Sequence, residues 1–152
     1  PSKITAIIDY AHTPDALENI LKTLVSLKKG SEKIITVFGC GGDRDKGKRP
    51  LMGDISTIYS EHVLVTSDNP RSEDPKKIIQ EICKGITPSK VKKVTIIEDR
   101  REAIKVAYEM ANSGDIILIA GKGHEKYQII GSEKIHFDDL EEIIEIFKKI
   151  QE

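Results

Sequence analysis

The segment Asp68-Asn69-Pro70-Arg71 brings a carboxylate, an amide and a guanidinium within four residues of one another. Pro70 restricts the backbone of Asn69, so these groups are held in a narrow range of positions. An arginine can grip a carboxylate through two parallel hydrogen bonds, while Asp and Asn can hold an ammonium group. The segment is therefore complementary to the head group of an amino acid. The alternative is an Asx turn that leads into a helix cap at Asp74.

A glycine-rich, basic segment at residues 39–50 could cradle an anion, because its backbone N–H groups are accessible and cations accompany them. These cations are Arg44, Lys46, Lys48 and Arg49. The segment has no GK[ST] ending, so it is not a Walker A loop, and it lacks the third glycine of the dinucleotide fingerprint. The alternative is a solvated loop whose charge is partly neutralised by Asp43 and Asp45. We expect Cys40 to be a small structural residue here, because no obvious base accompanies its thiol.

Two further segments carry binding groups. In residues 121–125, Glu125 could hold an amine and Lys122 a carboxylate or phosphate, and the alternative is a tight turn between strands. His12 could contact a phosphate or stack on a base, although a histidine at a helix start more often makes a local hydrogen bond. Asp9 could bind a ribose or cap a helix. No Ser-His-Asp or Cys-His set can be assembled, so these residues predict binding chemistry without a complete catalytic site.

Five short apolar runs rich in Ile, Val and Thr must position these groups. Continuous runs of this kind predict strands that are covered on both faces. They lie at residues 4–9, 34–38, 62–66, 94–97 and 116–120. Each binding segment follows one of these runs, and ligands bind beyond the carboxyl ends of the strands in open parallel sheets. We therefore expect the four segments to converge on one edge.

Helical stripes separate the strands, and their start signals are clear. Thr13 and Asp74 each precede a proline, while Asp99 and Asp138 are followed three residues later by a glutamate, as in a capping box. Helix ends are predicted at Gly30, Gly85 and Gly114. A hairpin is predicted around Gly131-Ser132, followed by a helix at residues 139–150. The fold class is thus a three-layer, Rossmann-like α/β domain with a mostly parallel sheet and a C-terminal β-hairpin plus helix.

The length and the charge of the chain limit the number of domains and the classes of binding partner. The 152 residues predict one domain over 1–152, and 24 Lys+Arg against 25 Asp+Glu argue against nucleic-acid or membrane-surface binding. Membrane insertion is not expected, because no run approaches about 18 consecutive apolar residues. Cys40 and Cys83 lack metal-ligand spacing, so we expect no bound metal and a cytoplasmic location. Although the net charge is only -1, we expect two local pairs of opposite charges: Asp68 with Arg71, and Lys122 with Glu125.

Four motifs, in register with the predicted strands, resemble the C-terminal domain of the Mur ligases over essentially the whole chain. They are DYAHTPDALENIL from Asp9, FGCGGDRDKGKRPLMG from Phe38, SDNPRSEDP from Ser67 and AGKGHEKYQ from Ala120. Within that family the sequence is most similar to members that add meso-diaminopimelate to UDP-N-acetylmuramoyl-L-Ala-D-Glu. Members that add lysine depart from the Asn-Pro-Arg pattern.

The resemblance implies roles for eight residues. Six of them would bind the diamino acid: Arg44 would contact a carboxylate, Asp68, Asn69 and Arg71 would bind the distal end, and Gly121 and Glu125 would hold the distal amine. The other two would contact the nucleotide: Asp9, at its ribose, and His12. The resemblance also implies ATP and Mg, with the phosphate loop and the Mg ligands in a separate central domain. An N-terminal domain would bind the UDP moiety.

Because the chain begins at Pro1 rather than Met, we expect an excised C-terminal domain that is inactive by itself. Its expected partners are the missing central and N-terminal domains, meso-diaminopimelate and the UDP-MurNAc-dipeptide. The complete reaction would pass through an acyl phosphate. The alternatives are the lysine-adding relative and a stand-alone regulatory module that binds an amino acid or a nucleotide.

Overall fold

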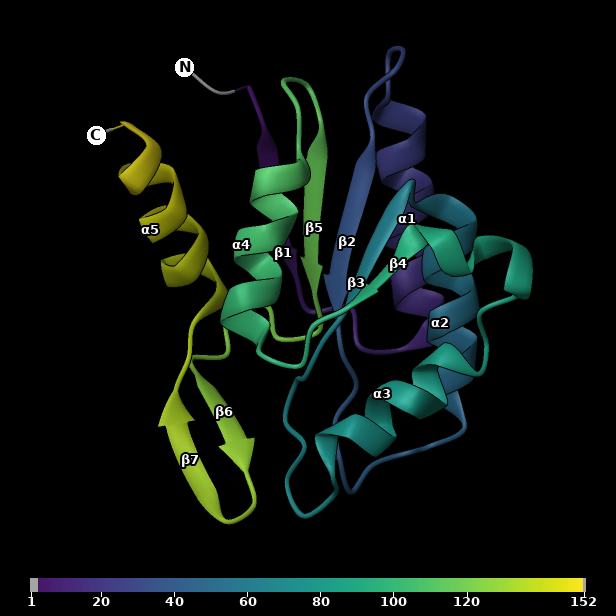
Figure 1. The fold of residues 1–152 in the computed structure, drawn as a ribbon, viewed down its shortest axis with the longest axis vertical. Helices are drawn as coiled ribbons and strands as arrows, with labels where there is room; N and C mark the ends of the chain where they lie inside the picture. The colour runs from purple at the N-terminus through teal and green to yellow at the C-terminus, as the bar shows by residue number, and fades with distance from the viewer. Residues whose placement is uncertain (1–2, 152) are drawn as a thin grey trace.

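The computed structural model describes residues 3–151, and a five-stranded sheet lies at its centre (Figure 1). The strands are β1 (Thr5–Asp9), β2 (Ile34–Phe38), β3 (His62–Val65), β4 (Val94–Ile96) and β5 (Ile116–Ala120). Their order is β1-β5-β2-β3-β4 and every pair is parallel, which confirms the predicted α/β class. The strand bounds agree with the predicted runs to within one residue at each end.

Helices cover both faces of this sheet. One face carries α1 (Pro14–Leu27), α2 (Lys48–Tyr59) and α3 (Pro75–Cys83), and the other carries α4 (Arg100–Met110) and α5 (Asp139–Gln151) (Figure 1). A 3₁₀ helix, η1 (Pro88–Lys93), precedes β4. Successive side chains of a strand point to opposite faces, so β2 supplies Ile34 and Phe38 to one core and Ile35 and Val37 to the other.

The predicted helix starts are confirmed by their caps. Thr13 Oγ1 accepts a hydrogen bond from Ala16 N, and Asp74 and Asp99 accept from backbone N–H groups two residues on. Asp138 does the same for the N–H of Leu140 at the start of α5. These bonds satisfy N–H groups that have no partner within the helix.

The predicted helix ends are less accurate. α3 ends as predicted, because its last residue is Cys83, its C-cap is Lys84 and Gly85 follows. α1 and α4 end earlier than predicted, at Leu27 and Met110, several residues before Gly30 and Gly114. Gly114 instead turns the chain into β5 with a φ of 94°, a conformation that glycine adopts without steric cost. The prediction of an irregular segment over residues 39–50 is also wrong at its end, because α2 already begins at Lys48. Pro50 lies in the first helical turn, where its missing N–H costs no intrahelical hydrogen bond.

The hairpin forms a second, separate sheet. Strands β6 (Tyr127–Ile130) and β7 (Glu133–His136) pair antiparallel, and Gly131 between them has a φ of 60°. Figure 1 shows this hairpin beyond the carboxyl ends of the main strands, on the side of α4 and α5. It is therefore placed next to the loops in which the binding groups were predicted.

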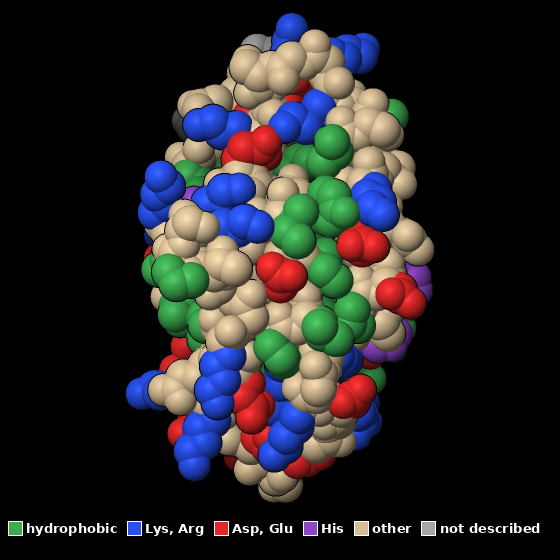
Figure 2. Space-filling view, turned by 90° about the vertical axis from the view of Figure 1, so that its right-hand side faces the viewer, with side chains coloured by type: hydrophobic (Ala, Val, Ile, Leu, Met, Phe, Trp, Pro, Cys, Tyr) green, Lys and Arg blue, Asp and Glu red, His purple; other side chains and the backbone are tan. Residues whose placement is uncertain are grey.

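Charges of both signs are interspersed over the face that α1, α2 and α3 cover, with hydrophobic side chains between them (Figure 2). Exposed hydrophobic residues on this side include Val25, Leu51 and Ile58. In the part of the chain that the structure describes, no helix is long and apolar enough to cross a bilayer.

Candidate functional site

The loops that follow β1, β2, β3 and β5 meet at one edge of the sheet, as predicted. Gly121 N donates to Asp9 O at 3.0 Å, which joins the ends of β5 and β1. Gly42 N donates to Asn69 O at 2.7 Å, which joins the loops after β2 and β3. All four predicted binding segments therefore lie at this edge.

Asn69 is buried at the centre of this edge, and its side-chain oxygen is already engaged. Oδ1 accepts hydrogen bonds from Lys122 Nζ at 2.8 Å and from Ile129 N at 2.9 Å. Asn69 was expected to hold the ammonium of a ligand, but the ammonium bound to its Oδ1 belongs to Lys122 of the protein. The oxygen of Asn69 is thus committed to the fold.

Lys122 is completely buried, which corrects the prediction that it would bind a ligand carboxylate or phosphate. Its Nζ lies 2.9 Å from Asp68 Oδ1 and donates to Tyr127 O at 2.8 Å, in addition to its bond with Asn69. The expected pairs Asp68 with Arg71 and Lys122 with Glu125 are therefore wrong. A buried ammonium must satisfy its donors locally, and the carboxylate of Asp68 is the charged partner in reach.

Arg71 has a backbone conformation that is uncommon for a residue other than glycine, with a φ of 55°. The hairpin holds it there, because Arg71 N donates to Ile129 O at 3.0 Å and Gly131 N donates to Arg71 O at 2.6 Å. The half-buried guanidinium donates through Nη1 to Gly42 O at 2.9 Å. A guanidinium has five N–H donors, so this bond orients the group and leaves donors that can face a ligand.

Arg44 lies on the exposed loop after β2 and donates to Asp43 O at 2.9 Å. Gly41 lies between Arg44 and Arg71. A Cβ atom built on Gly41 would be 3.6 Å from Arg44 Cγ and 2.9 Å from Arg71 Nη1. The structure thus brings the loop of Arg44 and the segment of Arg71 together. Ser72 Oγ secures the contact by donating to Asp43 Oδ1 at 2.6 Å.

Glu125 is half-buried and accepts a hydrogen bond from Tyr10 Oη at 3.4 Å. The negative charge of Glu125 is the main cause that raises the pKa of Tyr10, and the charge of Asp68 adds to it. Gly121 has a φ of 114°, which favours glycine, and it lies beside Asp68: Oδ2 would be 3.5 Å from a Cβ atom there. Two carboxylates and a phenol therefore surround the loop after β5. Tyr10 was missed by sequence reasoning, although it lies inside a motif that was singled out.

Asp9 and His12 lie on the loop after β1, and both make the local contacts that were the alternatives to ligand binding. Asp9 Oδ2 accepts from Ala11 N at 2.9 Å, and the Nδ1 of exposed His12 is 3.0 Å from Tyr10 O. Lys48 Nζ donates to His12 O at 2.7 Å, which ties this loop to α2. These bonds use one carboxylate oxygen and one ring nitrogen, so Asp9 Oδ1 and His12 Nε2 are the atoms that could contact a nucleotide.

Two buried arginines hold this edge together, and neither was predicted to do so. Arg49 was expected among the anion-binding cations, but its guanidinium contacts Glu73 at 2.7 Å, Glu81, and Gly41 O at 3.0 Å. Its partners raise the pKa of Arg49 against the opposing effect of burial. Arg100 donates through Nη1 to Ser67 O and through Nη2 to Ala120 O, each at 3.2 Å. In the sequence Arg49 is one of several cations in the segment 39–50 and Arg100 is an ordinary residue after the cap Asp99, so no local signal could have found them.

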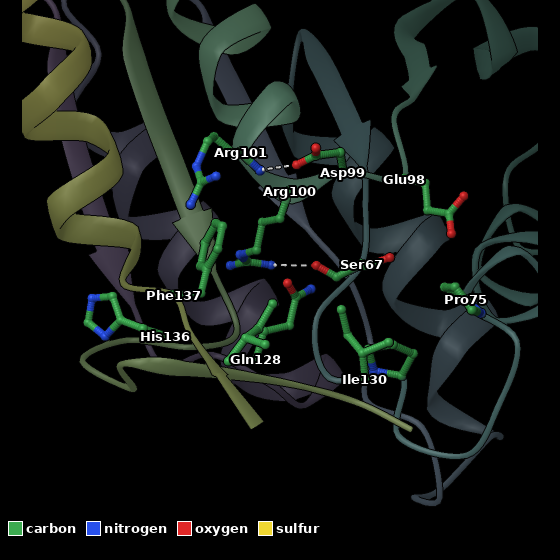
Figure 3. Close-up of a pocket in the computed structure, with 12 residues that line it drawn as sticks. Ser67, Pro75, Glu98, Asp99, Arg100, Arg101, Gln128, Ile130, His136 and Phe137 are labelled. Carbon is green, nitrogen blue, oxygen red and sulfur yellow. Dashed lines mark hydrogen bonds between the residues drawn. The ribbon is translucent and has the colours of Figure 1, made fainter. Parts of the chain in front are cut away.

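A cavity of about 450 Å³ is lined in part by Ser67 and Pro70, the residues that flank Asp68 and Asn69 (Figure 3). Figure 3 shows Arg101, Gln128 and Phe137 around it, with Glu98 at its far side. None of the eight predicted binding residues lines this cavity.

Metal binding has no candidate in the described residues. Over residues 3–151, no group of three or more His, Cys, Asp or Glu side chains is placed to hold a metal ion.

Comparisons with known proteins agree with the geometry. The UDP-N-acetylmuramoyl-L-alanyl-D-glutamate--2,6-diaminopimelate ligase of Cytophaga hutchinsonii is 58% identical over 138 residues, which are 91% of this chain and 28% of that protein. A solved structure of a ligase with the same name matches with a TM-score of 0.92 at 44% identity, over 100% of this chain and 31% of the other. E. coli FolC in complex with ADP matches with a TM-score of 0.60 at 16% identity, over 96% of this chain and 29% of FolC, which shows a shared fold alone.

The chain thus spans 28% of the length of the Cytophaga relative and 31% of the solved ligase. A family model described as "Mur ligase, glutamate ligase domain" matches residues 1–123, which is most of the chain. With its parallel sheet, its separate hairpin and the four loops that meet at one edge, the chain belongs to the Mur ligase family as a glutamate ligase domain.

Proposed function

We propose that this chain is the diamino-acid-binding domain of an ATP-dependent ligase that adds meso-diaminopimelate to UDP-MurNAc-L-Ala-D-Glu. The observation that carries the proposal is one edge of the sheet. There Arg71 lies beside Asn69, while Asn69 and Asp68 contact the loop after β5, at Lys122 and Gly121. Relatives with the corresponding enzyme name are 52–58% identical over more than nine-tenths of this chain.

The site is suited to a zwitterion with a carboxylate and an amine at one end. Arg71 and the Nδ2 donors of Asn69 would bind the distal carboxylate, because they are hydrogen-bond donors held on the same short segment. Asp68, Glu125 and the backbone of Gly121 would bind the distal amine, because carboxylates are acceptors only when ionised.

Arg44 would bind a second carboxylate of the same molecule. Its exposed loop lies against the segment of Arg71 at Gly41, so the two guanidinium groups would reach one substrate from adjacent positions.

This arrangement would select diaminopimelate over lysine. Lysine lacks the distal carboxylate, so Arg71 would be desolvated without a partner when lysine binds. An unpaired buried polar group costs about 1–3 kcal/mol, and more when it is charged. Sites of this kind reject analogues that lack the expected polar group.

The remaining parts of the reaction would lie elsewhere in a longer protein that acts in the cytoplasm. A central domain would bind ATP with Mg, and an N-terminal domain would bind the UDP moiety, while Asp9 and His12 of this chain would contact the nucleotide. The γ-phosphoryl group of ATP would pass to the D-Glu side-chain carboxylate, and the amine of diaminopimelate would then displace the phosphate. Because the phosphate loop is not in these residues, we expect the 152-residue chain to hydrolyse no ATP.

Steady-state kinetics of the complete ligase test the proposal. The wild-type enzyme should use meso-diaminopimelate in strong preference to L-lysine. Arg71→Ala should raise the KM for diaminopimelate about tenfold or more while leaving the KM for ATP within about twofold, as loss of a charge-assisted hydrogen bond predicts. Arg101→Ala, an exposed arginine on α4, is the matched control and should change neither value. Equal use of lysine, or a proportional loss for both substrates in Arg71→Ala, would contradict the proposal.

A further inference from the structure

Lys122 is a buried cation that forms two hydrogen bonds and one ion pair with residues around the proposed site. Nζ contacts Asp68 Oδ1 at 2.9 Å, Asn69 Oδ1 at 2.8 Å and Tyr127 O at 2.8 Å. These acceptors come from the segment after β3 and from the start of β6. Burying an ammonium is costly unless it is paired and hydrogen-bonded, so this geometry is tightly constrained.

The contact with Asn69 determines which way its amide points. Lys122 Nζ and Ile129 N are both donors and both approach the same atom of Asn69, so that atom must be the oxygen. The Nδ2 group is then the polar end that the amide can offer to a ligand. Without Lys122, one of the two donors that enforce this orientation would be lost.

The contact with Asp68 has a corresponding effect on the carboxylate. Oδ1 faces Lys122, whereas Oδ2 lies on the side of Gly121, 3.5 Å from the position of a Cβ atom there. A second anchor, the bond from Gln128 Nε2 to Asp68 O at 2.7 Å, holds the backbone of the same residue. One oxygen of Asp68 is therefore structural and the other is directed to the proposed amine subsite.

We propose that Lys122 is a positioning residue for the distal end of the diamino acid. It holds Asn69 so that the Nδ2 donors face the substrate carboxylate beside Arg71, and it holds Asp68 so that Oδ2 faces the substrate amine. This inference rests on the proposed function. It adds that Lys122, a residue out of contact with the substrate, aligns Asn69 and Asp68, which bind it.

Kinetics of Lys122→Met and Lys122→Arg in the complete ligase test this role, with meso-diaminopimelate and L-lysine as the amino acids. Lys122→Met should raise the KM for diaminopimelate about tenfold or more and leave the KM for ATP within about twofold. The ratio of kcat/KM for diaminopimelate to kcat/KM for lysine should fall by a similar factor, because lysine has no distal carboxylate for Asn69 to bind. Lys122→Arg retains a cation with several donors and should recover part of the preference.

Leu24→Ala controls for a general loss of stability. Leu24 is buried in the last turn of α1, at the opposite end of the sheet from the site, so this variant should be less stable with an unchanged preference. A fall in preference in Leu24→Ala equal to that in Lys122→Met would overturn the positioning role.

Asn69→Asp decides the question if Lys122→Met does not fold. Asp has nearly the same shape and keeps an acceptor for Lys122, but it replaces the Nδ2 donors by a second oxygen. If Nδ2 faces the substrate carboxylate, Asn69→Asp should lower kcat/KM for diaminopimelate about tenfold or more and affect lysine much less. Unchanged kinetics in Asn69→Asp would overturn the inference. Failure of the wild-type enzyme to use diaminopimelate would instead overturn the proposed function.

Discussion

The guanidinium of Arg100 and the carboxylate of Asp139 form two parallel hydrogen bonds, Nε to Oδ1 at 2.8 Å and Nη2 to Oδ2 at 2.7 Å, with both side chains completely buried. The same guanidinium donates to Ser67 O and Ala120 O. The pair therefore joins the start of α5 to the carboxyl ends of β3 and β5. It lies directly behind the loops that carry the proposed site.

Removing one member of this pair should be strongly destabilising. Arg100→Ala or Asp139→Ala leaves an uncompensated buried charge, which costs about 3–5 kcal/mol of the free energy of unfolding. Urea denaturation followed by circular dichroism measures this loss. Arg101→Ala is the adjacent control: Arg101 is exposed and pairs with Glu142, so the expected loss is below about 1 kcal/mol. Similar losses for Arg100→Ala and Arg101→Ala would contradict the prediction.

Gly42→Ala should separate the two loops that carry Arg44 and Arg71. A Cβ atom at Gly42 would lie 1.8 Å from Pro70 O, so the backbones must move apart and the bond from Gly42 N to Asn69 O is strained. We expect a loss of about 1–3 kcal/mol in the free energy of unfolding, as for other overpacked positions. Gly30→Ala is the matched control, because its Cβ atom would meet only the side chain of Glu32 at 3.7 Å. Unchanged thermal unfolding of Gly42→Ala would show that the loops are not in close contact.

The ion pair of Glu73 with Arg49 should make stability depend on pH in the acid range. Hydrogen bonds from Arg49, followed by one from Asp43 N, lower the pKa of Glu73 from 4.5 to about 2. Because the folded pKa is below the unfolded one, the stabilisation is complete above about pH 4.5 and is lost as the pH falls towards 2. Since Glu73 remains partly exposed, we expect about 1–2 kcal/mol after screening by solvent.

Urea denaturation of Glu73→Gln at several pH values measures this effect. The difference from wild type should be present at pH values above 4.5 and should shrink towards zero near pH 2. Glu133→Gln, on exposed strand β7, should match wild type throughout. A constant difference for Glu73→Gln over this range would show that the carboxylate charge is not the cause.

Cys40 should be unreactive in the folded protein. It is buried with its Sγ 3.8 Å from Met52 Sδ, and burial raises the pKa of its thiol to about 12. Only about one thiol in ten thousand would be ionised at pH 8, and the thiolate is the reactive form. In a Cys83→Ser background, Ellman's reagent should react at least about 100-fold more slowly with folded than with unfolded chain. Rapid reaction of the folded protein would show that the thiol is accessible.

Much of the fold follows from short-range signals. Continuous β-branched runs predicted the five strands, because burial on both faces leaves no room for polar alternation. Thr13, Asp74, Asp99 and Asp138 predicted helix starts, because a cap bonds to backbone N–H groups within three residues. The start of α2 was missed, because Pro50 is compatible with both a loop and a first helical turn.

The convergence of the candidate site was also predictable, because parallel strands place their carboxyl ends at one edge. The contacts within it were not. Lys122 was expected at the ligand and is buried against Asp68 and Asn69 instead, while Arg49 and Arg100 give no sign in the sequence of being buried.

Local patterns were therefore sufficient for the strands, the caps, the family motifs and the edge where the loops meet. Packing in three dimensions determined which charges became partners. The reason is physical: 24 Lys+Arg and 25 Asp+Glu allow many pairings, and the strength of each depends on how far folding removes it from water. Lys122 and Asp68 lie 54 positions apart in the chain, so their contact exists only once β3 and β5 have brought their ends together.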